Sequence, residues 1–324
     1  MFYDVELDIK LVGTNNQEEW TVEKKQTFRG IIPPVPSIFT KEGKLDFGGM
    51  GRLIDHVIHG GVHGLFFLGS GGEFISMSEA LRKQTAEFCV KHTAGRVPVL
   101  IGIAAPGTDE TIMFGKHAES IGADGVVVIN PYYGLLGEEN LYNHYKQISK
   151  ELKLPILIYN YPGASGQNFP IHIIKRLALE CPNIIGLKDT VDTMNHIRAA
   201  ILEVKSIRPD FLVFSGFDEY LLSTLIIGGD GCVPASAIFA PHLTVGIYEA
   251  FQKKDYESAF ELQRLLSYVP QEIYPLESPF YAVIKESARM VGVDISTHVL
   301  APAAALSEEK KQLLKESLKR IGAI

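Results

Sequence analysis

The stretch from Asn183 to Thr190, NIIGLKDT, places a lysine at the end of an apolar run. Such a run followed by polar turn residues predicts a buried strand that ends near Lys188. Side chains alternate along a strand, so Gly186 shares the face of Lys188 and leaves room beside it. Burial lowers the pKa of a lysine, and a neutral amine is a nucleophile towards ketones. The alternative is a lysine just past the strand end, with its ammonium in water or paired with Asp189.

Reactive and polar side chains follow several other apolar runs at the same relative place. Residues 69–73 (GSGGE) follow one run, residues 130–133 (NPYY) follow another, and Tyr159 ends a third. Residues 216–219 (GFDE) follow a fourth. If these are loops at one edge of a sheet, they bring together an amine, three phenols, a glycine-rich turn that can hold a carboxylate, and acids that can bind hydroxyls. A Schiff-base aldolase fits this set best.

Each of these features also has a plainer interpretation. The GSGGE stretch is also compatible with a simple tight turn. Tyr132, Tyr133 and Tyr159 could be core or interface aromatics, which is the commoner role of tyrosine. Asp218 and Glu219 could open a helix, where acidic side chains are favoured. Their joint occurrence at successive strand ends is what favours a functional site.

A histidine-rich stretch, HVIHGGVH, offers a competing metal-dependent chemistry. His56, His59 and His63 have a spacing that resembles metal ligands, and a metal-dependent aldolase needs such a set. However, the stretch precedes the apolar run that starts at Gly64, so it lies at a helix end and the following turn. That is the face opposite the expected catalytic mouth, so we expect surface or helix-end histidines and no metal site.

The elements that position these residues are short apolar runs, spaced mostly by roughly 30 residues. They lack strict polar alternation, which is typical of parallel strands covered on both faces. The eight runs begin at Gly30, Gly64, Val97, Gly125, Leu154, Asn183, Phe211 and Gly231.

Helical patterns lie between the runs. One is predicted to begin with a capping box formed by Ser76 and Glu79 and to close at Gly95, and another begins at Thr108 and ends near Gly122. Eight strand–helix units of this period predict a (β/α)8 TIM barrel. A doubly wound sheet is the alternative, but no strand is followed by GxGxxG.

The expected organisation has three parts. Residues 1–28 form a polar N-terminal extension, residues 29–241 form the barrel, and residues 242–324 form a C-terminal helical appendage. In that last part the apolar strand signal stops and helical patterns follow. These helical patterns cover residues 242–252, 255–269, 277–292 and 307–321.

Composition excludes several classes of protein. The chain has 324 residues, 31 basic and 38 acidic side chains, and a formal charge of −7, which disfavours a nucleic-acid binder. No apolar run approaches the ~20 residues that span a bilayer. The N-terminus lacks a signal-peptide pattern. Three widely separated cysteines, Cys89, Cys181 and Cys232, favour a reducing compartment, so we expect a cytoplasmic protein.

Taken together, the motifs resemble those of the dihydrodipicolinate synthase and N-acetylneuraminate lyase family of class I pyruvate aldolases. The resemblance runs from about Gly30 to the C-terminal helices, and the order and spacing of the motifs are specific to that family. The matching motifs are GSGGE (69–73), NPYY (130–133), YNYP (159–162), GLKD (186–189), SGFDE (215–219) and GGDG (228–231).

The resemblance implies a role for each matching residue. Lys188 is the Schiff-base lysine, and Tyr159 is the phenol that shuttles protons. Ser70 and Gly71 occupy the pair of positions that holds the carboxylate of the pyruvyl group. Tyr133 matches a tyrosine that family members contribute across a dimer interface. The substrate-binding residues expected beside them are Gly71, Thr190, Gly216, Asp218, Glu219 and Val233, the last of which borders the lysine.

Two departures from the synthase pattern indicate the branch of the family. Synthases usually carry two threonines where this chain has Ser70 and Gly71, and an arginine where it has Ala164. Without that cation, an aldehyde that carries a carboxylate loses its charge-assisted partner. Asp218 and Glu219 match acids with which sialic-acid-cleaving members hold sugar hydroxyls. The sequence therefore most resembles the 2-keto-3-deoxy-gluconate aldolases.

The expected reaction is reversible cleavage of a 2-keto-3-deoxy sugar acid into pyruvate and a hydroxyaldehyde, without metal or organic cofactor. The alternatives that keep the Schiff base are a dihydrodipicolinate synthase, an N-acetylneuraminate lyase and a keto-acid dehydratase. A barrel that only binds keto acids is the non-catalytic alternative. The resemblance also implies a homotetramer built from tight dimers.

Overall fold

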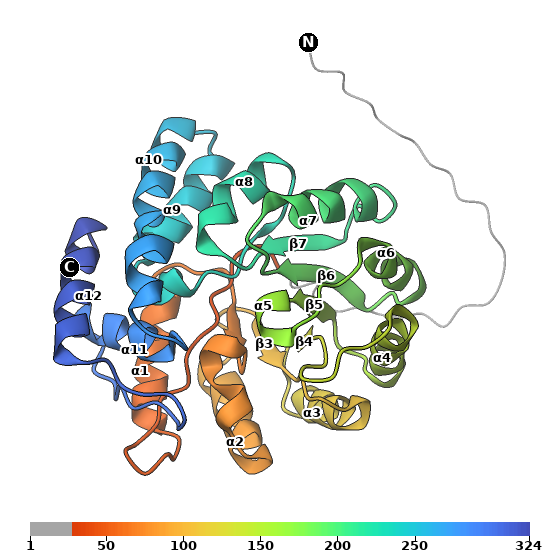
Figure 1. Cartoon of the computed structure of the whole chain (residues 1–324), viewed down its shortest axis with the longest axis horizontal. Coiled ribbons are helices and arrows are strands. Elements are labelled where there is room, and N and C mark those ends of the chain that lie inside the picture. Colours follow the sequence, from red (N-terminus) through yellow and green to blue (C-terminus); the bar gives the residue numbers. More distant parts are fainter. Residues whose placement is uncertain (1–27) are drawn as a thin grey trace.

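Eight parallel strands form the centre of the molecule in the computed structural model, which describes residues 28–324 (Figure 1). Their order in the sheet is β1-β8-β7-β6-β5-β4-β3-β2. The strands are β1 (Gly30–Ile31), β2 (Leu65–Phe67), β3 (Val99–Gly102), β4 (Gly125–Ile129), β5 (Ile156–Asn160), β6 (Ile184–Asp189), β7 (Leu212–Ser215) and β8 (Gly231–Cys232).

The sheet closes on itself next to β1. The main-chain N–H of Val35 donates to the carbonyl of Phe66 at 2.8 Å, and the N–H of Phe66 donates to the carbonyl of Pro33 at 3.0 Å. These bonds join the segment after β1 to β2, so the predicted (β/α)8 barrel is confirmed. The strands are short and covered on both faces; β4, for example, is buried along its whole length. That double burial explains why the runs are apolar without alternation.

Helices surround the strands (Figure 1). In the barrel they are α1 (Phe47–His59), α2 (Glu79–Thr93), α3 (Thr108–Ser120), α4 (Glu138–Glu151), the short α5 (Pro162–Ser165), α6 (Ile171–Glu180), α7 (Met194–Ala199), α8 (Leu221–Ile226) and α9 (Pro241–Gln252). Among residues 28–324, no helix is long and apolar enough to cross a bilayer.

The predicted start of the second helix is wrong by two residues. Ser78, not Ser76, is the N-cap of α2, and its Oγ accepts a hydrogen bond from the N–H of Leu81 at 3.2 Å. Ser76 instead ends a 3-10 turn, Phe74–Ser76, which buries Phe74. The spacing of Ser76 and Glu79 is that of a capping box, but Ser76 belongs to the preceding 3-10 turn, so the helix begins two residues later than predicted.

The C-terminal helices are present as expected, with one late start. They are α10 (Tyr256–Leu266), α11 (Tyr281–Met290) and α12 (Glu308–Arg320), and they lie with α9 on one side of the barrel (Figure 1). The helix predicted from residue 277 begins only at Tyr281. A non-α stretch that contains Pro270, Pro275 and Pro279 connects α10 to α11, because proline cannot continue a helical hydrogen-bond ladder. The predicted extension 1–28 lies, apart from Phe28, outside the described residues.

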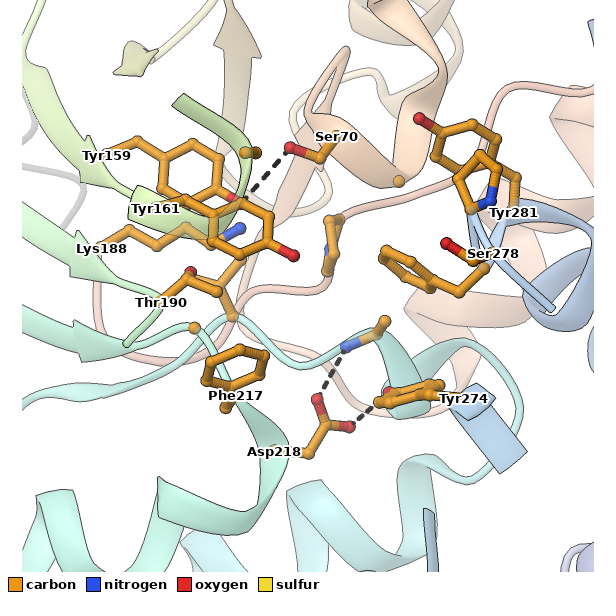
Figure 2. A pocket seen from close by; sticks show the side chains of 18 of the residues that line it. Ser70, Tyr159, Tyr161, Lys188, Thr190, Phe217, Asp218, Tyr274, Ser278 and Tyr281 are labelled. Carbon is orange, nitrogen blue, oxygen red and sulfur yellow. Dashed lines mark hydrogen bonds between the residues drawn. The ribbon is translucent and has the colours of Figure 1, made fainter. Parts of the chain in front are cut away.

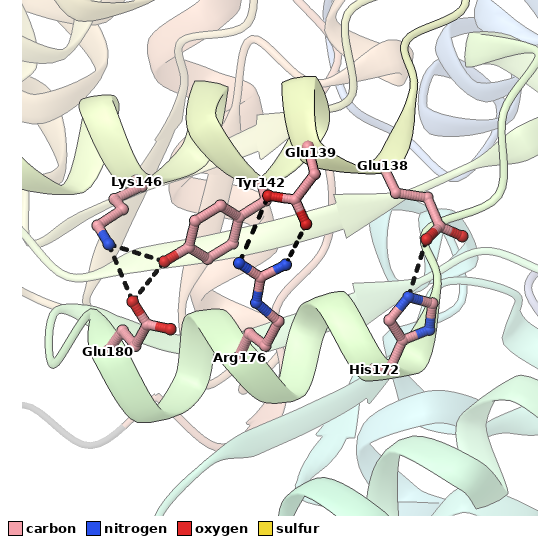
Figure 3. Close-up of polar contacts among 7 residues, drawn as sticks. All are labelled: Glu138, Glu139, Tyr142, Lys146, His172, Arg176 and Glu180. Carbon is pink, nitrogen blue, oxygen red and sulfur yellow. Dashed lines mark hydrogen bonds and ion pairs between the residues drawn. The ribbon is translucent and has the colours of Figure 1, made fainter.

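Polar pairs connect neighbouring helices on the outside of the barrel, as between α4 and α6 (Figure 3). Glu180 accepts hydrogen bonds from the Tyr142 hydroxyl and from Lys146, and the guanidinium of Arg176 lies 4.0 Å from the centre of the Tyr142 ring. Arg176 also pairs with Glu139. Exposed pairs of this kind contribute about 0–1 kcal/mol each, so the apolar core remains the main source of stability.

Candidate active site

A cavity of about 420 Å³ opens at the carboxyl ends of the strands (Figure 2). Its volume lies in the range of roughly 300–1,000 Å³ that is usual for small-molecule sites. In a parallel barrel this end carries the chemistry, because the βα loops meet there. Of the residues singled out from the sequence, Ser70, Gly71, Tyr159, Ala164, Lys188, Thr190, Gly216, Asp218 and Val233 line it.

Lys188 projects from β6 into the inner end of the cavity. Its Nζ lies 4.0 Å from the centre of the Tyr159 ring and 5.0 Å from that of Phe66, and only 4% of the residue is exposed. Burial lowers the pKa of Lys188 to about 7, and the Cys232 thiol and Asp218 carboxyl nearby offset part of this effect. A substantial fraction of the amine is therefore neutral near pH 7, as nucleophilic attack requires.

The alternative of an ion pair between Lys188 and Asp189 is wrong. Asp189 points to the other side of β6, where one carboxylate oxygen accepts from Asn160 Nδ2 at 2.7 Å and the other lies 2.7 Å from His196 Nδ1. Burial acts to lower the pKa of His196, but the contacts with Asp189 and with the Phe169 carbonyl outweigh it and raise the pKa. This network fixes the ends of β5 and β6, and it leaves Lys188 without a salt bridge to any carboxylate in residues 28–324.

Tyr159 is the neighbour of Lys188 in the register of β5 and β6. Its hydroxyl lies 3.4 Å from Ser70 Oγ, which is a long hydrogen bond (Figure 2). Burial raises the pKa of the Tyr159 phenol, while the Ser70 and Thr190 hydroxyls act in the opposite direction. The phenol is therefore neutral at working pH, and its link to Ser70 offers a route along which a proton can be relayed.

Thr190 turns its hydroxyl inward beside Gly216. A Cβ at position 216 would come within 1.8 Å of Thr190 Oγ1, so a glycine is needed at that close approach. Within residues 28–324, Thr190 Oγ1 is buried near the Tyr159 phenol but makes no hydrogen bond of good geometry. A buried hydroxyl without a well-placed partner costs free energy, so it is a natural contact for a bound polar ligand.

The two predicted hydroxyl-binding acids differ in their positions. Asp218 lines the cavity, but its carboxylate already accepts from the main-chain N–H groups of Ala235 and Ser236 and from the Tyr274 hydroxyl (Figure 2). Glu219 does not line the cavity. Burial and the neighbouring Asp218 raise the pKa of Glu219 to about 7. The expectation that both acids hold sugar hydroxyls stays a prediction, and Asp218 has little free capacity for it.

Tyr133 also lies away from the cavity. It is fully exposed and has a positive φ of 77°, which is uncommon for a residue with a side chain. The neighbouring Tyr132 packs its ring against Phe74. A role for Tyr133 across an interface stays a prediction, since this chain alone does not bring its hydroxyl to Lys188.

Two histidines of the HVIHGGVH stretch, His56 and His63, contact main-chain groups. His56 Nε2 lies 3.2 Å from the Ile238 carbonyl, and His63 Nδ1 accepts from the Ile31 N–H at 3.2 Å. Burial lowers the pKa of both rings. Across the described part of the chain, no three His, Cys, Asp or Glu side chains gather as metal ligands would.

Sequence reasoning missed one whole wall of the cavity. Residues 274–281, which follow α10 and end on the first residue of α11, face Lys188 across the open space (Figure 2). Their pattern reads as the start of a helix, and no local signal points to the barrel mouth. Tyr161, whose ring stacks on Tyr159, and Phe217 complete the lining. Tyr161 lies in the YNYP motif (159–162), so the sequence could have identified it as a residue of the site.

A comparison with protein-family models matches residues 27–321 to the dihydrodipicolinate synthetase family. The chain belongs to this family. It is 47% identical over 284 residues to YjhH of Escherichia coli K12, covering 88% of this chain and 94% of that protein. It is 45% identical over 294 residues to YagE of the same organism, covering 91% and 97%. Their names assign them, provisionally, as a 2-dehydro-3-deoxy-D-pentonate aldolase and a 2-dehydro-3-deoxy-D-gluconate aldolase.

Solved structures of the family have the same fold. The crystal structure of YagE from Escherichia coli K12 in complex with pyruvate superposes with a TM-score of 0.90 at 44% identity, covering 92% of this chain and 99% of that one. A dihydrodipicolinate synthase from Thermotoga maritima superposes with a TM-score of 0.87 at 30% identity, covering 92% and 100%.

Ala164 lines the cavity on the wall beside Tyr161. The resemblance leads us to expect an arginine at this position in a synthase. Here a methyl group faces the cavity. The wall beside Tyr161 therefore lacks the cation that would hold a second carboxylate.

Proposed function

We propose that this protein is a class I aldolase that reversibly cleaves a 2-keto-3-deoxy sugar acid into pyruvate and a neutral hydroxyaldehyde. The observation that carries the proposal is Lys188, an amine buried at the mouth of the barrel with a pKa lowered to about 7. The similarity to two aldolases named for such sugar acids, one of them crystallised with pyruvate, supports the same chemistry.

The reaction begins at the keto group. Neutral Lys188 attacks C2, and loss of water leaves a protonated imine that withdraws electrons from C3. Ser70 and Gly71, which line the same end of the cavity, hold the C1 carboxylate. The expected result is a pyruvyl group fixed with its C3 towards Tyr159.

Bond cleavage then needs a proton acceptor at the C4 hydroxyl. Tyr159 takes this proton while it gives its own phenol proton to Ser70 Oγ, 3.4 Å away, and Ser70 in turn releases its hydroxyl proton to the solvent in the open cavity. The C3–C4 electron pair moves to the imine and forms an enamine, and the aldehyde departs. Protonation of C3 and hydrolysis then release pyruvate and restore the amine. The scheme requires no metal or organic cofactor.

Ala164 favours an aldolase of neutral aldehydes over a dihydrodipicolinate synthase, because no arginine is there to bind a carboxylate on the second substrate. N-acetylneuraminate lyase and keto-acid dehydratase activities remain the alternatives with the same imine. The exposed Tyr133 supports a dimer in which this ring covers the partner's cavity, within a homotetramer. Three buried free thiols are compatible with the cytoplasm.

The test is pyruvate release from a panel of 2-keto-3-deoxy sugar acids and N-acetylneuraminate, together with condensation of pyruvate with aspartate semialdehyde. We expect release from a five- or six-carbon keto-deoxy acid, and loss of activity in Lys188→Met. Lys41→Met, which changes an exposed lysine, is the matched control. Activity only with aspartate semialdehyde, or full activity in Lys188→Met, would contradict the proposal.

A further inference from the structure

Residues 274–281, here called the 274–281 segment, form the wall of the cavity that faces Lys188 (Figure 2). We infer that this segment is the binding site for the aldehyde half of the substrate, and that the hydroxyls of Ser278 and Tyr281 select a neutral, hydroxylated aldehyde. The inference rests on the proposed function and adds to it the residues that recognise the second half. The pyruvyl half is bound at Lys188, so the rest of the substrate must extend towards this wall.

The polar groups of this wall are free to bind a ligand. Among the described residues, neither Ser278 Oγ nor the Tyr281 hydroxyl makes a hydrogen bond to the protein, and Tyr161 offers a third free hydroxyl from the adjacent wall. The Tyr274 hydroxyl differs, because it donates to Asp218 at 2.8 Å. A hydroxyl can both donate and accept, so this set matches the hydroxyls of a short sugar-derived aldehyde.

The charges of the lining disfavour an anionic aldehyde. Lys188 is used for the imine, and no other lysine or arginine lines the cavity in residues 28–324. Glu277 lines the outer part, and its carboxylate is paired with Lys310 of α12 at 2.8 Å and accepts from the Ser278 N–H at 3.2 Å. An aldehyde with a carboxylate or phosphate would meet Glu277 and Asp218 in a lining that, in residues 28–324, offers no cation except Lys188.

The wall is also held in a fixed place. Tyr281 is the first residue of α11, and Lys285, one turn later, forms a buried ion pair with Glu73. Glu73 directly follows the turn Ser70–Gly72, which carries the carboxylate-binding residues. One ion pair thus connects the two ends of the cavity, so the distance between the pyruvyl and aldehyde sites is set before the substrate binds.

The test uses the full chain with Ser278→Ala, Tyr281→Phe and the double variant. Ser206→Ala and Tyr256→Phe are matched controls on exposed residues outside the cavity. In the condensation direction, pyruvate is combined with glyceraldehyde, with propanal, which lacks the hydroxyls, and with glyceraldehyde 3-phosphate. Borohydride trapping of pyruvate measures the first half of the reaction separately.

Each single variant should raise the KM for glyceraldehyde by about 2–10-fold, because each removes one hydrogen bond to the aldehyde. The double variant should abolish the preference for glyceraldehyde over propanal. The pyruvate concentration for half-maximal trapping should stay within about two-fold of the unchanged protein. The unchanged protein should also prefer glyceraldehyde to its phosphate.

The outcomes that overturn this inference alone differ from the one that also overturns the proposed function. The role of the 274–281 segment alone is overturned if the double variant traps pyruvate normally and still prefers glyceraldehyde to propanal. It is also overturned if the affinity for pyruvate falls as much as the affinity for glyceraldehyde. Preference for the phosphate also overturns it. Failure of the unchanged protein to trap pyruvate overturns the proposed function and this inference together.

Discussion

The buried ion pair between Glu73 and Lys285 gives a quantitative prediction for stability. Both side chains are fully buried, and Lys285 also donates to the His298 carbonyl at 2.7 Å. The other carboxylate oxygen of Glu73 accepts from the Leu300 N–H at 2.8 Å. The ion pair therefore connects the loop after β2 to α11, and the two main-chain hydrogen bonds connect both side chains to the segment before α12.

Replacement of Lys285 by Met removes the cation and leaves the Glu73 carboxylate buried without its partner. Breaking a buried pair in this way costs about 3–5 kcal/mol, which in a chain of this size corresponds to a fall in Tm of roughly 4–7 °C. Glu73→Gln together with Lys285→Met should be much less harmful than the sum of the two single changes, because no buried charge remains uncompensated. The amide oxygen that Glu73→Gln introduces can still accept from the Leu300 N–H.

The assay is thermal unfolding of the four proteins of this cycle, followed by circular dichroism at one concentration. Lys319→Met, which breaks an exposed surface pair with Glu316, is the control and should change Tm little. The reasoning is refuted if Lys285→Met unfolds at the temperature of the unchanged protein, or if the double variant loses as much as both single variants combined.

Three further predictions concern the chemistry. The rate of imine formation with pyruvate should rise with pH and be half-maximal near pH 7, because the neutral form of Lys188 is the nucleophile. The Asp218 carboxyl acts to raise the pKa of Lys188, so Asp218→Asn should move this midpoint to lower pH in a stopped-flow or trapping assay. Tyr159→Phe should still trap pyruvate but lose about 10²–10⁴-fold in kcat for cleavage, and turnover equal to the unchanged protein would remove the phenol from the mechanism. Ala164→Arg should lower the KM for an aldehyde that carries a carboxylate, measured by condensation kinetics, and no gain for such aldehydes would contradict the role given to this position.

The barrel could be predicted from the sequence because each strand is buried on both faces and therefore leaves an uninterrupted apolar run. The site residues at strand ends followed from the same pattern, since parallel strands place their carboxyl ends at one edge. Lys188 and Tyr159 each end an apolar run, and the two runs form neighbouring strands in which these residues are paired.

Other features depend on packing between distant parts of the chain. The 274–281 segment leads into α11, which an ion pair joins to the loop after β2 through Lys285 and Glu73, two residues far apart in the sequence. The carboxylate of Asp218 accepts hydrogen bonds from the turn after β8 and from Tyr274, and no local sequence pattern predicts these contacts. The cap of α2 lies at Ser78 and not at Ser76, which belongs to the preceding 3-10 turn.

The most direct test of the central claim is reduction with borohydride in the presence of pyruvate, followed by peptide mass analysis. We expect a stable mass increase equal to one reduced pyruvate per chain, located on Lys188 and absent from Lys188→Met. No adduct at neutral pH, or an adduct that persists in Lys188→Met, would contradict the Schiff-base mechanism.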